Sequence, residues 1–369
     1  MSSIVHRFVS AIADEADATL IRPSNWNDGH DLTLAATQRA IGRNTAGAGA
    51  AEEVTASQIF DWISATNGAF LWRSGGTWQA STNITVDNDN LTIAETFSPS
   101  APAAGKVKIH GVVSAGRPML SAIGPTGTRM PLQPLTGTRM QFSVLPRNDG
   151  ANVLTVTGTR ADLTGTLTAR LLATTNAYTA ARKCGIVSAA GAGSVANEHA
   201  AANVFVRGNA ANMGGFYLCQ RFGISDASLV ATANMFVGVS NTSSALADVG
   251  PETLTNLIGI GCTSGDTTLQ LYAAGASAQS RTSLGANFPC NTISTDIYEV
   301  VLFAPANASS VMWECTRLLT GDRATGTISA GANLPSATAF LTWQMQRSNG
   351  GTASAVGIDL FGVYGESDI

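Results

Sequence analysis

From residue 184 to the end of the chain, short apolar runs alternate with turn residues. Runs such as 204–206 and 298–303 are rich in Val, Ile, Leu, Phe and Tyr and are separated by Gly, Asn, Asp, Ser and Pro. About nine runs of this kind fit the segment, and none shows the 3.6-residue periodicity of an amphipathic helix. Short strands between turns are typical of two antiparallel sheets packed face to face. We therefore expect residues 184–369 to form a β-sandwich or jelly roll.

Only the first 65 residues carry helical signals. Asp31 is placed to cap a short helix over residues 31–43. A stronger signal is the capping box of Thr55 and Gln58, in which each side chain can accept a hydrogen bond from the other residue's backbone N–H. The apolar positions that follow fall on one helix face: Ile59, Trp62 and Ile63. These signals predict a segment with short helices.

Beyond this segment the pattern changes to strands and tight turns. The Ser-Gly-Gly sequence at 74–76 lies between aromatic runs and predicts a hairpin. Residues 83–93 alternate apolar and polar positions around a second turn at 87–90. The Pro- and Ala-rich stretch at 98–105 is typical of a linker.

Charge is scarce and unevenly distributed. Charged residues make up 12% of the 369 residues, against roughly 25% in ordinary globular proteins. Residues 1–100 carry a net charge of −6, residues 101–183 carry +8 and residues 184–369 carry −6, which gives the net charge of −4. We expect domain boundaries near the two changes of sign. Low charge with ordinary apolar content excludes a disordered tail and a long coiled coil.

These patterns predict a mainly β chain of four parts. A segment with short helices at 1–65 is followed by a hairpin and linker at 66–100. A small basic β-domain at 101–183 and a C-terminal β-sandwich at 184–369 complete the chain, both expected to be sandwich-like or jelly-roll-like.

Two patterns bear on membranes and nucleic acids. No run of 18 apolar residues exists and the N-terminus lacks the apolar centre of a signal peptide, so we expect no membrane insertion and synthesis in a cytoplasm. The basic residues of 101–183 are spaced at roughly ten residues and accompanied by few aromatics, unlike a phosphate-binding patch. We therefore expect no nucleic-acid partner. The basic block is expected to pack against acidic neighbours in the same chain or in another copy.

The sequence contains no motif for a cofactor, a metal or a nucleophile. The four histidines lack metal-ligand spacing, and no phosphate-binding loop and no G-x-S-x-G turn occurs. The five cysteines form no C-x-x-C pair, and their odd number does not indicate a disulfide framework, so we expect small buried side chains. Catalytic residues, metals and cofactors are all predicted to be absent, and the chain is not expected to be an enzyme.

One enzymatic alternative stays open. Asp296, Glu299 and Glu314 lie on or beside predicted strands. Two of them could meet on one face as the paired acids of a polysaccharide hydrolase. Acids at such positions more often stabilise the structure by hydrogen bonds or face solvent.

A binding function is indicated by aromatic residues in strand-like runs of a chain with few aromatics. Tyr272, Trp313 and Trp343 could stack on sugar rings if they were exposed on one face of the sandwich. The alternative interpretation is that the same three rings fill the core. Both remain open from the sequence.

Several strings resemble segments of tailed-bacteriophage fibre and virion proteins. Residues 19–30 contain Arg-Pro-Ser-Asn-Trp-Asn-Asp-Gly-His, which resembles an R-P-S-x-W-N-x-x-H segment near the start of such proteins. The helix and hairpin at 55–78 and the stretch 102–108 resemble the parts that follow. Strings in the last part resemble a C-terminal β-domain: 215–223, 235–238, 296–298, 302–305 and 364–366.

The resemblance implies a virion structural protein made in the bacterial host cytoplasm and then part of the particle. It implies a tail fibre that contacts other virion proteins through its N-terminus and presents the C-terminal domain to host-surface polysaccharide, with a homotrimer as the expected assembly. A capsid decoration or head-fibre protein and a polysaccharide depolymerase are the alternatives. The expected docking residues are Arg22, Pro23, Trp26, His30, Ile59 and Trp62.

Overall fold

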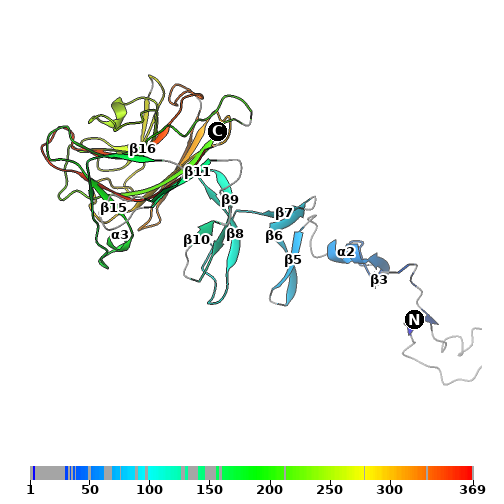
Figure 1. Cartoon of the computed structure of the whole chain (residues 1–369). Helices are drawn as coiled ribbons and strands as arrows, with labels where there is room; N and C mark the ends of the chain where they lie inside the picture. Colours follow the sequence, from blue (N-terminus) through cyan, green and yellow to red (C-terminus); the bar gives the residue numbers. More distant parts are fainter. Residues whose placement is uncertain are drawn as a thin grey trace, which may run out of the picture. The chain divides into compact units, whose positions relative to one another are not determined.

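The computed structural model of the chain has two compact units, Met1–Thr96 and Phe97–Ile369 (Figure 1). The structure describes these residues: 3–4, 30–31, 34, 36–37, 39–48, 51–61, 69–74, 76–87, 90–95, 99–125, 129–131, 140–145, 155–157, 160–211, 213–277, 279–329 and 331–367. None of the described helices is long and apolar enough to cross a membrane. We call the two parts the N-terminal unit and the C-terminal unit.

The described residues of the N-terminal unit form small antiparallel sheets and one short helix. Three strands form its largest sheet: β5 (Ala69–Ser74), β6 (Thr77–Asp87) and β7 (Asn90–Ile93). The other elements are two strand pairs and the helix: β1 (Ser3–Ile4) with β2 (His30–Asp31), β3 (Arg39–Gly42) with β4 (Glu52–Thr55), and α2 (Ala56–Asp61).

The capping box predicted for the second helix is confirmed. The backbone N–H of Thr55 donates to Oε1 of Gln58 at 2.8 Å, and the backbone N–H of Gln58 donates to Oγ1 of Thr55 at 3.1 Å. These bonds satisfy two donors that the start of α2 would otherwise leave unpaired.

The helix predicted over residues 31–43 is wrong. The chain forms β3 there, with Ala40 paired to Val54 of β4. Val54 is buried, and the burial of β3 alternates residue by residue, as it does in a strand. Pairing with β4 has therefore overridden a weak local preference for a helix.

Both predicted hairpins are present. Ser74 pairs with Thr77, and Gly76 has a φ of +86°, which glycine adopts at little cost. In the second hairpin Asp87 pairs with Asn90, Val86 with Leu91 and Ile84 with Ile93. The alternation of residues 83–93 thus places four apolar side chains on one face of β6 and β7.

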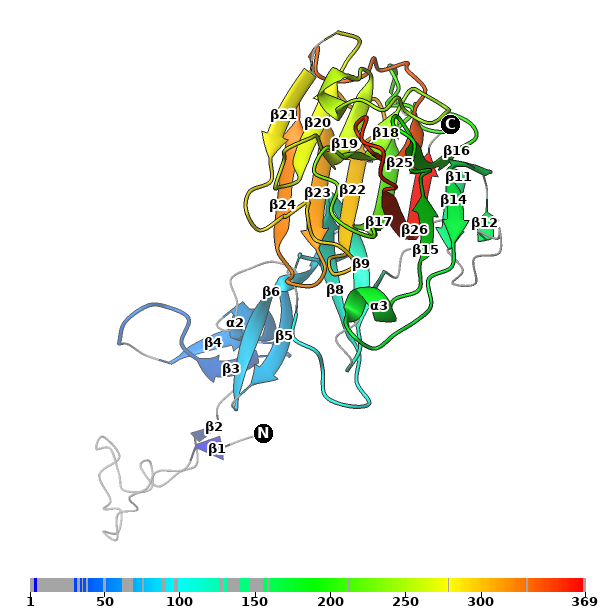
Figure 2. The same cartoon turned by 90° about the vertical axis from the view of Figure 1, so that its left-hand side faces the viewer.

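The C-terminal unit is a β-sandwich of two large antiparallel sheets (Figure 2). We call them sheet I and sheet II. Sheet I contains nine strands: β11 (Met140–Leu145), β12 (Thr155–Thr157), β14 (Thr166–Thr168), β15 (Cys184–Val187), β17 (Phe216–Ile224), β22 (Tyr298–Ala304), β23 (Val311–Arg317), β24 (Arg323–Ile328) and β26 (Gly357–Ser367). Sheet II contains seven: β13 (Ala161–Thr164), β16 (Val195–Ala200), β18 (Asn234–Ser240), β19 (Leu257–Cys262), β20 (Gln270–Ala274), β21 (Gln279–Ser283) and β25 (Thr342–Ser348). The prediction of a mainly β chain with a sandwich architecture is confirmed.

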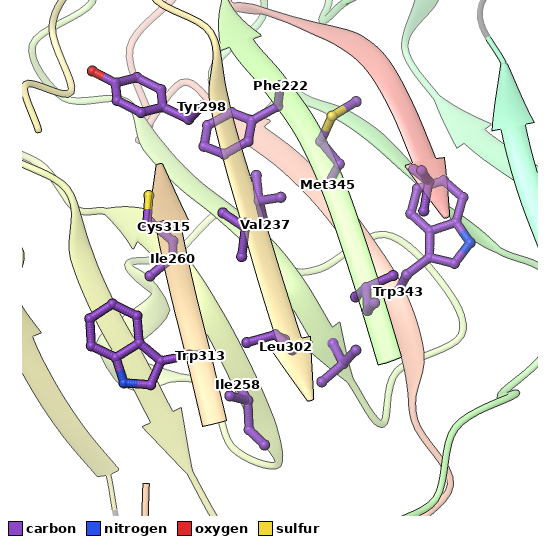
Figure 3. Packing of buried hydrophobic residues seen from close by; sticks show 14 of the residues in the cluster. Phe222, Val237, Ile258, Ile260, Tyr298, Leu302, Trp313, Cys315, Trp343 and Met345 are labelled. Carbon is purple, nitrogen blue, oxygen red and sulfur yellow. The ribbon is translucent and has the colours of Figure 1, made fainter. Parts of the chain in front are cut away.

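The space between the two sheets holds one continuous hydrophobic core. Phe222, Leu302 and Trp313 of sheet I meet Val237 and Met345 of sheet II in this cluster (Figure 3). Alternate strand residues point inward, so each strand contributes every second side chain to the core.

Residues 101–183 do not form a separate domain, in contrast to the predicted boundary at residue 183. Val144 of β11 pairs with Val363 of β26, and Asp162 of β13 pairs with His199 of β16. Strands from the basic block therefore complete both sheets of the sandwich. The two units divide between Thr96 and Phe97, close to the other predicted boundary near residue 100.

A third, smaller sheet of the C-terminal unit brings basic residues onto the outer face of sheet I. It contains β8 (Lys108–Ser114), β9 (Arg117–Ile123) and β10 (Arg129–Pro131). Arg117 of β9 forms two hydrogen bonds to the Glu366 carboxylate at 2.7 and 3.0 Å. Arg170, which follows β14 and lies outside the third sheet, binds Asp359 at 2.9 Å. The expectation that the basic block packs against acids is confirmed within the chain itself.

Candidate functional site

The predicted docking residues fall mostly outside the described residues. Arg22, Pro23, Trp26 and Trp62 are among those that the structure does not describe. His30 lies in β2, paired with Ile4, and Ile59 is half-buried in α2.

The three candidate glycan-binding aromatics are buried, so the prediction of a sugar-stacking face is wrong. Tyr272, Trp313 and Trp343 are 0%, 8% and 0% exposed. Trp313 and Trp343 lie on opposite sides of the core between the sheets (Figure 3). Rings that are covered in this way cannot stack on a ligand. The alternative interpretation, that they fill the core, is correct for Trp313 and Trp343.

Tyr272 is buried in a different place from the two tryptophans. Its cluster contains Phe236, Leu246 and Leu257, apart from the main core. Leu246 belongs to the segment between β18 and β19, which lies over this cluster. The sequence could not show this cover because it comes from a loop that forms no regular element around Leu246.

The three acids considered for hydrolysis are each engaged by an arginine. Asp296 accepts from Arg317 at 2.8 and 3.0 Å, and Glu299 accepts from Arg221 at 2.5 Å. Glu314 accepts from Arg323 at 2.7 Å and from the backbone N–H of Ala115 at 2.9 Å. Each of the three carboxylates is therefore one partner of an ion pair that stabilises the structure.

A small pocket lies on the outer face of sheet II. It has room for about one water molecule and is lined by apolar side chains from β18 and the following segment together with the polar residues Asn234, Gln346 and Ser348. A space of this size is far smaller than a typical ligand pocket. The Gln346 amide donates to the carbonyl oxygen of Ala247 at 3.3 Å, so the pocket lies where the covering loop is attached to the sheet. No group of three potential metal ligands occurs in the part of the chain that the structure describes.

The most unusual surface is an exposed apolar face in the N-terminal unit. Ile84, Val86 and Leu91 are 37%, 42% and 59% exposed, and Ile93 beside them is half-buried. Because opposite residues of an antiparallel pair point to the same side, these four form one stripe along β6 and β7. We call this stripe the apolar strip.

Little buried apolar surface is seen beneath the apolar strip in the described part of the N-terminal unit. Among the residues of this unit whose side-chain burial the structure describes, Val54 is the one buried hydrophobic residue. Ile41 and Phe70 are exposed as well. Sequence reasoning found the alternation of 83–93 but assigned it no function, since a strand pattern does not show whether its apolar side is covered.

A second apolar face lies on the hairpin of β8 and β9. Val107, Ile109 and Leu120 are exposed there, with Ile109 paired to Ala122 and Leu120 to Gly111. Exposed apolar side chains thus occur in both units, on strands that follow each other in the sequence.

No protein-family model matches this sequence, and no curated protein matches it. Among solved structures, a protein of unknown function from Shewanella oneidensis MR-1 is 12% identical and aligns over 64% of this chain and 89% of its own, with a TM-score of 0.44. Peanut lectin is 12% identical over 62% of this chain and 97% of its own, with a TM-score of 0.40. Arcelin-5, a lectin-like defence protein of Phaseolus vulgaris, is 9% identical over 63% and 99%, with a TM-score of 0.42. Structural similarity with TM-scores below 0.5 does not indicate what this chain binds.

Proposed function

We propose that this chain is a non-enzymatic structural protein of a bacteriophage particle, most simply a tail fibre that assembles as a homotrimer. The phage assignment rests on the resemblance of residues 19–30 and later strings to phage fibre proteins. The observation that supports assembly is the contrast between the two units. The C-terminal unit has an extensive core, whereas the N-terminal unit exposes the apolar strip and, among the residues whose side-chain burial is described, buries one hydrophobic side chain, that of Val54.

This contrast supports assembly through the N-terminal unit. Covering the hydrophobic face of a three-stranded sheet stabilises it, because apolar surface is removed from water. Contiguous exposed apolar residues on a protein surface mark interaction sites. Packing against further copies of the chain would cover the apolar strip, and identical chains usually assemble with closed symmetry.

Polar substitutions in the apolar strip should weaken the assembly. We expect the double variant Val86→Asn, Leu91→Asn to lower the association constant by more than about 100-fold, because each buried aliphatic side chain contributes roughly 1.5–3 kcal/mol. Light scattering coupled to size-exclusion chromatography gives the mass across a dilution series, with three chains expected for the unchanged protein.

Leu171→Asn is the matched control for this experiment. Leu171 is an exposed leucine of the C-terminal unit, far along the chain from the apolar strip. Its replacement should leave the mass profile unchanged. A double variant that dissociates at the same concentration as the unchanged protein would contradict assembly through the apolar strip.

The attachment role of the N-terminus is tested separately on particles. A chain that begins at residue 66 keeps β5, β6 and β7, and should therefore still assemble but fail to enter phage particles. Immunoblots of purified particles measure incorporation, and immunogold labelling of the full chain shows whether it lies on the tail or on the head. Incorporation of the shortened chain at the normal level would refute docking by residues 1–65.

A further inference from the structure

Five exposed leucines lie in loops at one end of the sandwich. Sheet I reaches this end with the last residues of β17, the first residues of β26 and the turn between β23 and β24. The short helix α3 (Ala177–Ala180) lies at the same end, below β15 in Figure 2. We call this group of exposed side chains the leucine end: Leu171, Leu172, Leu229, Leu318 and Leu319.

The loop before α3 is fixed to the loop after β17. Arg170 donates to Oγ of Ser225 at 2.9 Å. Leu171 and Leu172 directly follow Arg170, and Leu229 lies four residues after Ser225. This bond therefore holds two of the leucine-bearing loops together.

The turn between β23 and β24 joins the same surface through the segment before β22. The N–H of Leu318 donates to the carbonyl oxygen of Ile297 at 2.9 Å. In the same segment, the carbonyl oxygen of Ser294 accepts from the side-chain amide of Asn176, the residue that caps α3, at 3.2 Å. The five leucines therefore lie on one connected surface, although they come from three parts of the sequence.

The composition of the leucine end differs from that of a typical protein–protein interface. In its three loops, all of which the structure describes, every exposed large hydrophobic residue is a leucine. Binding hot spots between proteins are enriched in Trp, Tyr and Arg, and leucine is under-represented there. Leucine is well suited to hydrocarbon, because its transfer from water is favourable without a complementary partner surface. The composition therefore favours a lipid surface over a protein partner.

The backbone beside these leucines is suited to the edge of a bilayer. A backbone N–H or C=O that enters lipid without a hydrogen-bond partner is costly, because no water is present to replace the bond. The N–H of Ala173 donates to the carbonyl oxygen of Thr179 at 3.1 Å, and the N–H of Gly321 donates to that of Arg317 at 2.8 Å. Donors next to the exposed leucines are thus satisfied within the chain.

The charges at the leucine end favour an anionic surface. The carboxylates of Asp226 and Asp296 are each bound by an arginine. Asp322 is half-buried and accepts hydrogen bonds from two neutral side chains. Arg182, which follows α3, is exposed. Basic residues beside a membrane are attracted to its anionic lipids.

We propose that the leucine end docks on the surface of a lipid bilayer that contains anionic lipids. The leucine side chains enter the boundary between the headgroups and the acyl chains, and Arg182 lies beside the headgroup phosphates. The contact is peripheral, and no part of the chain has to cross the bilayer. The inference goes beyond the function proposed above and does not depend on assembly through the apolar strip.

Flotation of the full chain with vesicles tests the proposal. Vesicles of phosphatidylcholine and phosphatidylglycerol in equal amounts provide the anionic surface, and vesicles of phosphatidylcholine alone provide a neutral one. We expect the double variant Leu171→Asn, Leu172→Asn to lower the partition coefficient on the anionic vesicles by about 100-fold, because two aliphatic side chains no longer leave water. Arg182→Gln should lower it by about 5-fold on the anionic vesicles and leave it unchanged on the neutral ones.

Ile109→Asn, Leu120→Asn is the matched control for the leucine variant. It removes two exposed apolar side chains from the hairpin of β8 and β9. This hairpin is bound through Arg117 near the last residue of β26, whereas the leucine end lies near the first. The control should bind the vesicles as the unchanged chain does.

Three results would overturn the proposal. The first is that the unchanged chain does not float with the anionic vesicles, and the second is that the double leucine variant floats with them to the same extent. The third is a lower assembled mass of the double leucine variant in the absence of vesicles, which would show that a second copy of the chain covers these leucines.

Discussion

Replacing Asp226 by alanine is expected to lower the free energy of unfolding of the C-terminal unit by about 3–5 kcal/mol. The Asp226 carboxylate accepts two hydrogen bonds from Arg347, at 2.8 and 2.5 Å, and a third from the backbone N–H of Gly357 at 2.8 Å. Both charged side chains are almost fully buried. Without Asp226, the Arg347 guanidinium would remain buried in the core without a counter-ion. This uncompensated charge accounts for most of the expected loss of stability.

Chemical denaturation followed by tryptophan fluorescence measures this loss. The double variant Asp226→Leu, Arg347→Met should recover most of it, since removing both charges leaves neither one unpaired. Asp162→Ala breaks the ion pair with Arg160 at the surface, where the Arg160 side chain is 77% exposed. That control should leave stability unchanged. Equal losses from the buried and the exposed variant would show that Asp226 does not stabilise the unit in this way.

A second large effect is expected at Glu198, whose carboxyl is buried without a partner. Glu198 lies in β16 opposite Met345 of β25, a core residue, so its side chain points between the two sheets. It is fully buried, and neither carboxyl oxygen has a hydrogen-bond partner within the part of the chain that is described. Burial raises its pKa from the ordinary value of 4.5 to about 8.

Glu198 should therefore make the folded protein less stable as the pH rises. Above pH 4.5 the unfolded chain loses this proton, whereas the folded chain keeps it until about pH 8. Between these values the unfolded state binds fewer protons, so the free energy of unfolding falls with pH, by about 3 kcal/mol at pH 7. Above pH 8 both states are ionised and the loss no longer grows.

Glu198→Gln removes this titration. We expect the variant to match the unchanged protein near pH 4.5 and to be more stable by about 3 kcal/mol at pH 7. Urea unfolding at a series of pH values measures the difference. Glu299→Gln makes the same chemical change at a half-buried residue that pairs with Arg221, and should leave the slope between pH 4.5 and 8 in place. Parallel pH profiles for Glu198→Gln and the unchanged protein would contradict the buried-proton account.

Sequence reasoning succeeded where the signal was local. The capping box of Thr55 and Gln58 involves atoms three residues apart, and the turns at 74–76 and 87–90 depend on a few adjacent residues. Sequence reasoning failed over 31–43, where the strand Arg39–Gly42 is stabilised by pairing with Glu52–Thr55. This pairing depends on how the chain between the two strands turns.

For the candidate site residues, the sequence showed which side chains are present but not what surrounds them. The presence of aromatic rings in strands at 272, 313 and 343 was visible, but their exposure was not. Tyr272 is covered by a segment that contains Leu246, and Trp343 faces the opposite sheet. The acids were also visible, but their arginine partners were not: Glu299 meets Arg221 from 78 residues away.

The sequence by itself determined the class of secondary structure, the positions of the tight turns and the segregation of charge along the chain. Each of these follows from side chains that are neighbours in the sequence. Only the tertiary structure decided which face of each strand is covered. A strand has two faces, and contacts such as Arg117 with Glu366, 249 residues apart, decide which one meets protein and which one meets solvent. For this reason the alternation of residues 83–93 could be predicted, whereas the exposed apolar strip that it forms could be found only in the fold.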